Sequence, residues 1–515
     1  MGTNANVAEF MRTSARRTPD DIALVDGAES WTWSELDERV DHLAAGLVHA
    51  GVRVGDRVAI QQGNTRWFVV SYFAVLRAGA VAVPVNPALT AAETAILLTH
   101  CGARLVLCDS GSAPTATAAA DAVGSCEVVT ADSGDWRSIL AHGRRMAFVE
   151  AVTPGDALAV IMFTAGSGAS AKGAMLTHAA LRTNVELLLA LEGPAVVRAD
   201  DRVLVVVPTF HIYGLNAVLT LAIAAGARSI LLDRFDPVEA LTVIRDQSVS
   251  VVAGTPAMFL AWSRLPELGA GFGTMRLFTC GGSSLPPGVL EEFTSRAGIG
   301  IYEGYGMTEA GPVVTTTLVS GLPKAGSVGR ALPGVEIMLV DGFGDRVAEG
   351  DPGEVCVRSP SLFSGYWPHG AGGPDAQGWF RSGDVAFLDA DHDLHVVDRR
   401  HEVIVVNGFT VYPREVESVI EAMPEVAEAA VIAIADERSS EAVMALVVPR
   451  PGAVLTAVDV QGHCAQILAR FKCPTRIRIV ETLPHSSTGT IAKGRLGEVH
   501  GDMGSPTATP MGSAP

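Results

Sequence analysis

The chain has 515 residues, of which 48% are hydrophobic and 18% are charged, and its formal net charge at pH 7 is −18. This length allows two or more domains with large cores, and the composition is typical of an α/β enzyme. The negative charge, without any long basic run, argues against nucleic acid or an anionic membrane as a partner.

The first residues show no secretory signal, and no apolar stretch runs uninterrupted for about 18 residues. The seven cysteines are scattered, and none of them forms a CxxC pair. We therefore expect a cytoplasmic protein with reduced thiols and no membrane span.

Short runs rich in β-branched residues alternate with helix-like stretches along most of the chain. Such buried runs are typical of strands in parallel sheets whose faces are covered by helices. We predict an α/β fold with a large N-terminal domain, residues 1–397, of mixed, mostly parallel sheets with helices. Ligands bind at the carboxyl ends of strands in such sheets. Strands are predicted at 57–60, 81–85, 104–107, 158–163, 203–207 and 249–252, and a helix is predicted at 67–78.

A second pattern begins near residue 398. Pro413 stands where a helix can begin without losing a hydrogen bond, and apolar residues then recur on one helix face. We expect a small, mobile α+β C-terminal domain at residues 398–498, followed by a disordered tail at 499–515. The apolar helix face is Val416, Val419, Ile420 and Met423, and strands are predicted at 431–434 and 443–448.

Several short segments combine glycines with polar, acidic or aromatic residues. The most specific is YGMTE at 305–309, because an aromatic face can stack on a purine, a hydroxyl can donate to a phosphate and a carboxylate can bind a hard cation. The paired glycines at 281–282 allow a ligand to approach the backbone closely. The other segments are a glycine-rich loop (164–173), PTFHIYG (208–214), SGD (382–384), NGF (407–409) and LPHSSTGTI (483–491).

In their order along the chain, the segments resemble the motifs of the adenylate-forming (ANL) superfamily, in particular its acyl-CoA ligase branch. The resemblance covers residues 10–497. The resemblance implies that the aromatic ring of Tyr305 lies against adenine, that Asp384 accepts hydrogen bonds from the ribose, and that Glu309 binds magnesium. The implied nucleotide-binding residues are Thr164, Lys172, Gly281, Gly282, Ser283, Tyr305, Gly306, Met307, Thr308, Asp384 and Arg399, and the implied catalytic residues are His211, Thr308 and Glu309.

The resemblance also assigns a thiol side. In the family, the residue at the position of His211 closes the acyl pocket and guides the thiol. Asn407, Gly408 and Phe409 stand where rotation of the C-terminal domain brings a loop to the coenzyme A tunnel. His401 stands at the hinge, where the family commonly has Asp or Lys, so the hinge would respond to pH.

The chain departs from the family in two places that serve adenylation. Thr490 replaces the lysine that bridges the carboxylate and the α-phosphate, and losing one such donor costs about 10²–10³ in rate. Four substitutions also change the phosphate loop and remove hydroxyl donors. They are Ala165, Gly168, Ala169 and Ala171, in place of serine, threonine, glycine and proline.

We therefore predict a non-adenylating acyl-CoA ligase, which converts acyl-AMP and coenzyme A to acyl-CoA and AMP. A separate adenylating enzyme would supply the acyl-AMP, and the use of magnesium and ATP stays open. One alternative is a complete ATP-dependent ligase in which Lys172 or Lys493 compensates. The other alternative is a pseudoenzyme that binds AMP or acyl-AMP as a sensor or carrier. An engineered Thr490 and a carrier-protein thiol in place of coenzyme A are also open.

Overall fold

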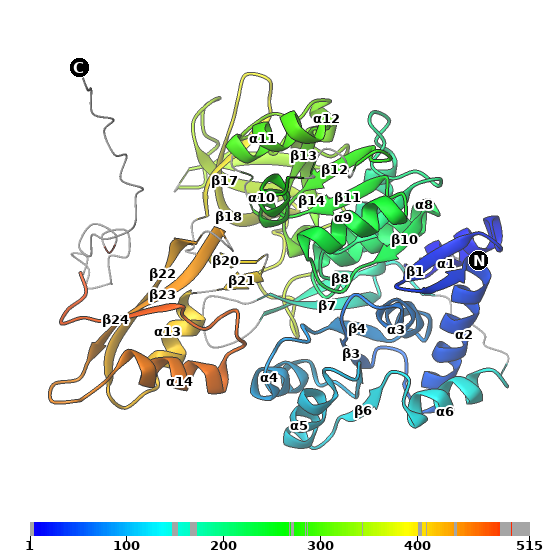
Figure 1. Ribbon diagram of the computed structural model, residues 1–515, viewed down its shortest axis with the longest axis horizontal. Helices are drawn as coiled ribbons and strands as arrows, with labels where there is room; N and C mark the ends of the chain where they lie inside the picture. The colour runs from blue at the N-terminus through cyan, green and yellow to red at the C-terminus, as the bar shows by residue number, and fades with distance from the viewer. Residues whose placement is uncertain are drawn as a thin grey trace. The chain divides into compact units, whose positions relative to one another are not determined.

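A computed structural model of the chain divides between residues 401 and 402 into two compact units (Figure 1). The predicted disordered tail, residues 499–515, lies outside the described residues. The structure describes residues 5–146, 153–164, 172–266, 268, 272–283, 285, 287–341, 343–399, 404–407, 409–411, 413–436, 440–484 and 496.

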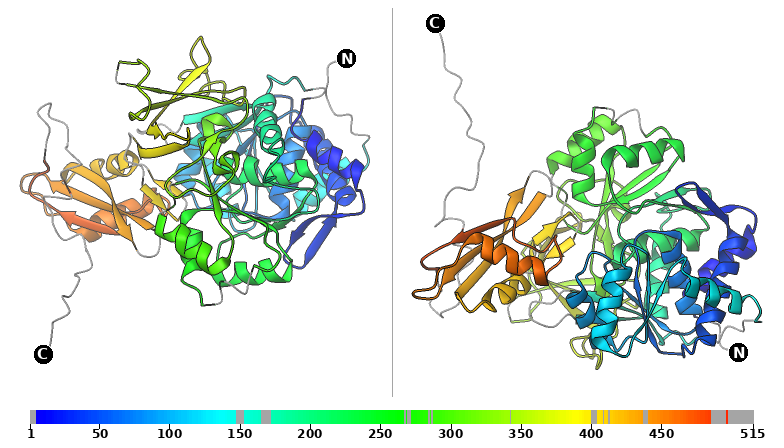
Figure 2. Two further views of the ribbon diagram at one scale, coloured as in Figure 1. Left: turned by 90° about the horizontal axis from the view of Figure 1, so that it is seen from above. Right: turned by 60° about the horizontal axis from the view of Figure 1, so that its bottom comes forward.

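The first unit contains a six-stranded sheet whose strands run parallel except for one edge strand. Val58 and Ile60 face one apolar cluster and Ala59 faces another, so both faces are buried. The right-hand view of Figure 2 shows blue and cyan helices around this sheet. The strand order is β6 (Glu127–Thr130), β5 (Leu105–Cys108), β3 (Arg57–Gln61), β4 (Val81–Pro84), β7 (Leu158–Thr164) and β8 (Lys172–Thr177). One face is covered by α2 (Trp33–His49), α3 (Arg66–Arg77) and α6 (Gly134–Gly143), and the other by α4 (Ala91–Cys101) and α5 (Ala113–Val123).

A nine-stranded sheet in the same unit has parallel central strands and antiparallel edges. Its apolar residues contribute to the cluster that also contains Val58 and Ile60, so one core joins the two sheets. The strand order is β15 (Arg330–Ala331), β14 (Val313–Thr316), β13 (Ile301–Gly306), β12 (Leu277–Cys280), β11 (Val251–Gly254), β9 (Arg202–Val205), β10 (Arg228–Leu231), β1 (Ile22–Asp26) and β2 (Glu29–Thr32). Its helices are α1 (Glu9–Arg17), α7 (His178–Leu189), the π-helix η1 (Tyr213–Thr220), α8 (Leu221–Ala225), α9 (Pro237–Asp246), α10 (Pro256–Ser263), α11 (Pro287–Ala297) and α12 (Thr317–Ser320).

A four-stranded antiparallel sheet completes the first unit. Its strands are β16 (Glu336–Val340), β17 (Gly353–Arg358), β18 (Trp379–Leu388) and β19 (Leu394–Arg399).

In its described residues, the second unit has a five-stranded sheet and two helices. Pro413 begins the first helix, whose buried Val416 and Ile420 pack against Val431 of the sheet, as the apolar spacing predicts. The strands are β21 (Phe409–Val411), β20 (Ile404–Val406), β23 (Ser440–Pro449), β22 (Val426–Asp436) and β24 (Arg476–Ile479), and the helices are α13 (Pro413–Glu421) and α14 (Ala457–Ile467).

The predicted fold class is confirmed, with a large portion of mixed sheets and helices and a smaller C-terminal portion. Every predicted strand of the first unit overlaps an observed one, because continuous β-branched runs are buried on both faces of these sheets. Within the residues that the structure describes, no helix combines the length and the apolar character needed to cross a membrane.

Five aromatic residues form the centre of the cluster between the nine-stranded sheet and its outer helices. Phe278 of β12 is fully buried, and its ring centroid lies 4.9 Å from Phe272 and 5.1 Å from Phe293, both edge-on. Phe259 and Trp262 of α10 complete the cluster. Because β12 leads directly into the paired glycines, this packing fixes the base of the predicted nucleotide loop.

We expect Phe278→Ala to lower the free energy of unfolding by about 3–5 kcal/mol, since it leaves a cavity among rings that cannot close it. Urea unfolding followed by tryptophan fluorescence measures the change. Phe343, which is 95% exposed, gives the matched control, and Phe343→Ala should change stability by less than about 0.5 kcal/mol. Equal effects of the two substitutions would contradict the packing described here.

Candidate active site

The paired glycines and the YGMTE segment lie side by side at the ends of two parallel strands. In the register of β12 and β13, Cys280 stands opposite Glu303, so the residues that follow each strand emerge at the same edge. Gly282 has a φ of +94°, in the left-handed region that favours glycine. A Cβ at Gly306 would lie 2.2 Å from the carbonyl oxygen of Pro312, so a larger residue cannot replace it there.

A hydrogen bond joins the YGMTE segment to the SGD segment. The phenol of Tyr305 donates to Oδ2 of Asp384 over 2.6 Å, and Tyr305 is buried. In the antiparallel pairing of β18 and β19, Arg399 stands opposite Asp384. The structure therefore brings together three residues that the sequence assigned to adenine and ribose.

Thr308 and Glu309 lie in a single 3-10 turn, η3 (Thr308–Ala310), directly after β13. Thr308 is buried, whereas Glu309 is half-buried, and its Oε1 accepts a hydrogen bond of 2.6 Å from the phenol of Tyr366. Met307 precedes the turn and donates its backbone N–H to Pro312 over 3.0 Å. A half-buried carboxylate is a hard oxygen ligand of the kind that magnesium uses together with phosphate oxygens, so Glu309 fits the predicted metal.

Lys172 begins the edge strand of the six-stranded sheet. Its backbone pairs with Thr164, whose hydroxyl donates to the Lys172 carbonyl oxygen over 3.3 Å. The side-chain ammonium lies 5.2 Å from the ring centroid of Tyr366, a cation–π distance. The substituted loop positions between Thr164 and Lys172 lie outside the described residues.

His211 is exposed just before the π-helix η1, and its Nδ1 accepts the backbone N–H of Tyr213 over 3.3 Å. Tyr213 points back to the glycine pair, since a Cβ at Gly281 would lie 3.3 Å from its ring. The buried amide of Asn216 donates to the Gly311 carbonyl oxygen over 2.7 Å and thereby ties η1 to the turn beyond Glu309. π-Helical turns often mark functional sites, and this one carries the predicted gate segment.

Asn407 and Phe409 belong to the second unit. Asn407 has a φ of +50° at the turn between β20 and β21, a conformation that asparagine tolerates better than most residues. The ring of Phe409 stacks on Phe471 at a centroid distance of 4.6 Å. Gly408, His401 and Thr490 lie outside the described residues, so their predicted roles stay predictions.

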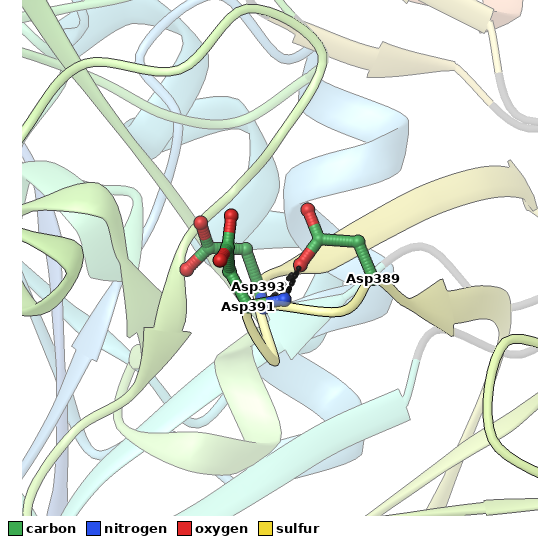
Figure 3. Close-up of side chains that lie close together, drawn as sticks. All are labelled: Asp389, Asp391 and Asp393. Atoms are coloured by element: carbon green, nitrogen blue, oxygen red, sulfur yellow. Dashed lines mark hydrogen bonds between the residues drawn. The ribbon is translucent and has the colours of Figure 1, made fainter.

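An acidic group at the turn between β18 and β19 has the composition of a metal site but holds a lysine. Asp389, Asp391 and Asp393 lie together in Figure 3. The ammonium of Lys324 lies 2.6, 2.9 and 3.1 Å from their carboxylates, and Arg330 pairs with Asp393. Because two cations already pair with these three carboxylates, we assign the group to the stability of the turn.

A buried acid lies beside the glycine loop. Glu303 is 4% exposed, and its Oε2 accepts the backbone N–H of Leu285 over 3.2 Å. Its Oε1 has no hydrogen-bond partner among the residues that the structure describes. Burial raises the pKa of the Glu303 carboxyl to about 7, against the opposing effect of the Leu285 N–H.

The comparisons with known proteins identify the family of the chain. A family model described as AMP-binding enzyme matches residues 11–367, and a second, described as AMP-binding enzyme C-terminal domain, matches residues 415–490. The chain belongs to the AMP-binding enzyme family. This confirms the prediction that the chain belongs to the adenylate-forming superfamily and its acyl-CoA ligase branch. The alignments with relatives of that branch span almost the whole chain.

A long-chain-fatty-acid–CoA ligase of Yersinia pestis is 31% identical to this member of the AMP-binding enzyme family, over 96% of this chain and 94% of its own. A feruloyl-CoA synthase of Amycolatopsis sp is 34% identical over 96% of this chain and 99% of its own. The crystal structure of ATP-bound MatB from Rhodopseudomonas palustris superposes with a TM-score of 0.73 at 31% identity, over 97% and 99% of the two chains.

Sequence reasoning missed three residues that contact the predicted site: Tyr213, Glu303 and Tyr366. Tyr213 and Glu303 lie inside segments that the sequence analysis had singled out. Glu303 lies in β13, where buried and half-buried residues alternate. Tyr366 lies in a glycine-rich stretch, and the sequence carries no signal that links it to Glu309.

We expect Glu303→Gln to remove a pH dependence of stability. Between pH 4.5 and about 7 the folded protein keeps a proton that the unfolded chain has lost, so this carboxyl lowers stability as pH rises through that window. The total effect is about 3 kcal/mol. Glutamine can still accept the Leu285 N–H, so the variant should gain stability over the wild type at about pH 8 but not at about pH 5.

Urea unfolding at both pH values measures this difference. Glu291→Gln on the exposed face of α11 is the control and should follow the wild type. If the free energy of unfolding of Glu303→Gln depended on pH as that of the wild type does, the Glu303 carboxyl would not have a pKa raised by burial.

Proposed function

We propose that this protein is an ATP-dependent acid–coenzyme A ligase. A carboxylic acid attacks the α-phosphate of ATP, forming acyl-AMP and releasing diphosphate. The thiol of coenzyme A then attacks the acyl carbon, forming the thioester and releasing AMP. The observation that carries the proposal is the hydrogen bond between Tyr305 and Asp384, in a chain of the AMP-binding enzyme family. It joins the two segments that we assign to adenine and to ribose.

The proposed roles follow from the contacts. We assign the Tyr305 ring to adenine, and its phenol orients Asp384. We assign Asp384 and Arg399, which stand opposite each other in the β18–β19 register, to the ribose hydroxyls. Thr308 donates to the α-phosphate, and Glu309 would hold a magnesium ion whose charge balances that of the phosphates. We assign His211 and Tyr213 to the acyl end, because the ring of Tyr213 lies against the glycine pair.

The complete reaction is favoured over the half-reaction that the departures in the sequence predict. The relatives that match this chain along almost its whole length are named ligases and synthases, and MatB is named as binding ATP. These names support the alternative of a complete ligase better than the prediction of a non-adenylating enzyme.

A second candidate function is thioesterification of acyl-AMP made by a separate adenylating enzyme. Thr490 and the altered phosphate loop favour it, because they remove donors from the adenylation step alone. In this candidate the nucleotide contacts of Tyr305 and Asp384 would serve the mixed anhydride in the same way.

Exchange of labelled diphosphate into ATP, with a panel of fatty and aromatic acids and magnesium, tests the proposal. We expect exchange with at least one acid, and acyl-CoA formation from that acid and equally from its acyl-AMP. Thioester formation from acyl-AMP without any exchange would replace the complete reaction by the half-reaction. Asp384→Ala should lose both activities, which controls for a contaminating enzyme.

Thr490→Lys should accelerate the exchange by about 10²-fold, because it supplies a cation at the developing charge. The rate from acyl-AMP and coenzyme A should stay within a factor of about two, since that step needs no such charge at the α-phosphate. An unchanged exchange rate would show that another cation, such as Lys172 or Lys493, already takes this place.

A further inference from the structure

Tyr366 belongs to a segment that crosses from the six-stranded sheet to the turn of Glu309. On one side the segment extends the sheet, because Ser364 donates its N–H to the Met175 carbonyl oxygen over 2.9 Å and Trp367 donates to Gly173 over 2.7 Å. On the other side Phe363 donates its N–H to the Glu309 carbonyl oxygen over 2.8 Å. The backbone of this crossing segment, residues 363–367, is therefore fixed at both ends.

Among the residues that the structure describes, the side chain of Tyr366 contacts two charged groups, each through a different kind of interaction. Its phenol donates to Oε1 of Glu309 over 2.6 Å, and the face of its ring lies 5.2 Å from the ammonium of Lys172. The ring of Phe363 packs edge-on against it, with centroids 4.9 Å apart, and restricts its rotation. One half-buried side chain thus touches both the proposed metal ligand and the proposed phosphate ligand.

The charges explain why such a contact is useful. In the part of the chain that the structure describes, Lys172 makes no ion pair, so its ammonium is kept near the ring by cation–π attraction and not neutralised by a carboxylate. Glu309 likewise receives a neutral phenol and pairs with no cation among the residues that the structure describes. An ion pair between these two residues would instead satisfy both charges and weaken their binding to phosphate and metal.

We propose that Tyr366 is a positioning residue for the diphosphate end of the nucleotide. It orients the Glu309 carboxylate towards a divalent cation and holds the Lys172 ammonium for a phosphate, while keeping the two charges apart. This inference rests on the proposed function, because it assumes that Glu309 and Lys172 serve a metal–nucleotide complex.

Two substitutions separate the contacts. Tyr366→Phe keeps the ring, its packing on Phe363 and the cation–π contact, and among the contacts with described residues it removes the hydrogen bond to Glu309. Tyr366→Leu removes both contacts. A role confined to packing would leave Tyr366→Phe like the wild type, whereas positioning of Glu309 would not.

The measurement is Mn²⁺ binding, followed by electron paramagnetic resonance, in the presence of a non-hydrolysable α,β-methylene ATP. We expect the apparent Kd for Mn²⁺ to rise about tenfold or more in Tyr366→Phe, because a hydrogen bond to a charged group is lost. The Kd for AMP, measured by calorimetry, should stay within about twofold, since Tyr305 and Asp384 are untouched. Tyr366→Leu should also weaken binding of the ATP analogue without metal, because Lys172 is no longer held.

Tyr72→Phe is the matched control, because it removes a buried phenol hydroxyl from α3 and should change neither constant. A double-mutant cycle adds a direct test. If the phenol acts through Glu309, Tyr366→Phe should have much less effect on Mn²⁺ binding in a Glu309→Gln background.

An unchanged Kd for Mn²⁺ in Tyr366→Phe, with a wild type that binds the metal–nucleotide complex, overturns this role and leaves the proposed function intact. Full additivity in the double-mutant cycle overturns it as well. A wild type that binds no metal–nucleotide complex but binds AMP overturns both the role of Tyr366 and the ATP-dependent reaction.

Discussion

The hydrogen bond between Tyr305 and Asp384 is the contact on which the rest of the site depends. Its two partners come from different sheets of the first unit and lie 79 residues apart in the chain. The bond requires β13 to end where β18 passes, and the glycine at 306 lets the Pro312 backbone approach closely enough to turn the chain into η3. Once that geometry is set, Thr308 and Glu309 follow on the next turn and can face the same ligand.

The packing of the surrounding elements holds the Tyr305 region in place. Aromatic packing around Phe278 fixes β12, and the register with β13 then places the glycine loop beside the YGMTE segment. Tyr366 and the π-helix η1 approach the same turn, the first through Glu309 and the second through the bond from Asn216 to Gly311. The proposed ligand-binding residues therefore lie in short turns directly next to strands and helices. Residues placed on such rigid elements keep their positions more precisely than residues of long loops.

Much of this could be predicted from the sequence. Continuous β-branched runs gave the strands of the first unit, because burial on both faces leaves little room for polar residues, and the apolar spacing after Pro413 gave α13. The motifs located Tyr305, Asp384 and Glu309. Tyr366 could not be found in this way, because its importance comes from a tertiary contact made 57 residues away, and no local pattern encodes such a contact. Glu303 was missed for a similar reason, since its place beside the glycine loop depends on a hydrogen bond from Leu285, 18 residues away.

The central claim is that Tyr305 and Asp384 bind one nucleotide together, and a crystal structure of the protein soaked with AMP tests it most directly. The account predicts adenine against the Tyr305 ring, the ribose hydroxyls within hydrogen-bond distance of Asp384, and the phosphate near Thr308. AMP bound at another place, with the Tyr305 to Asp384 region empty, would contradict it.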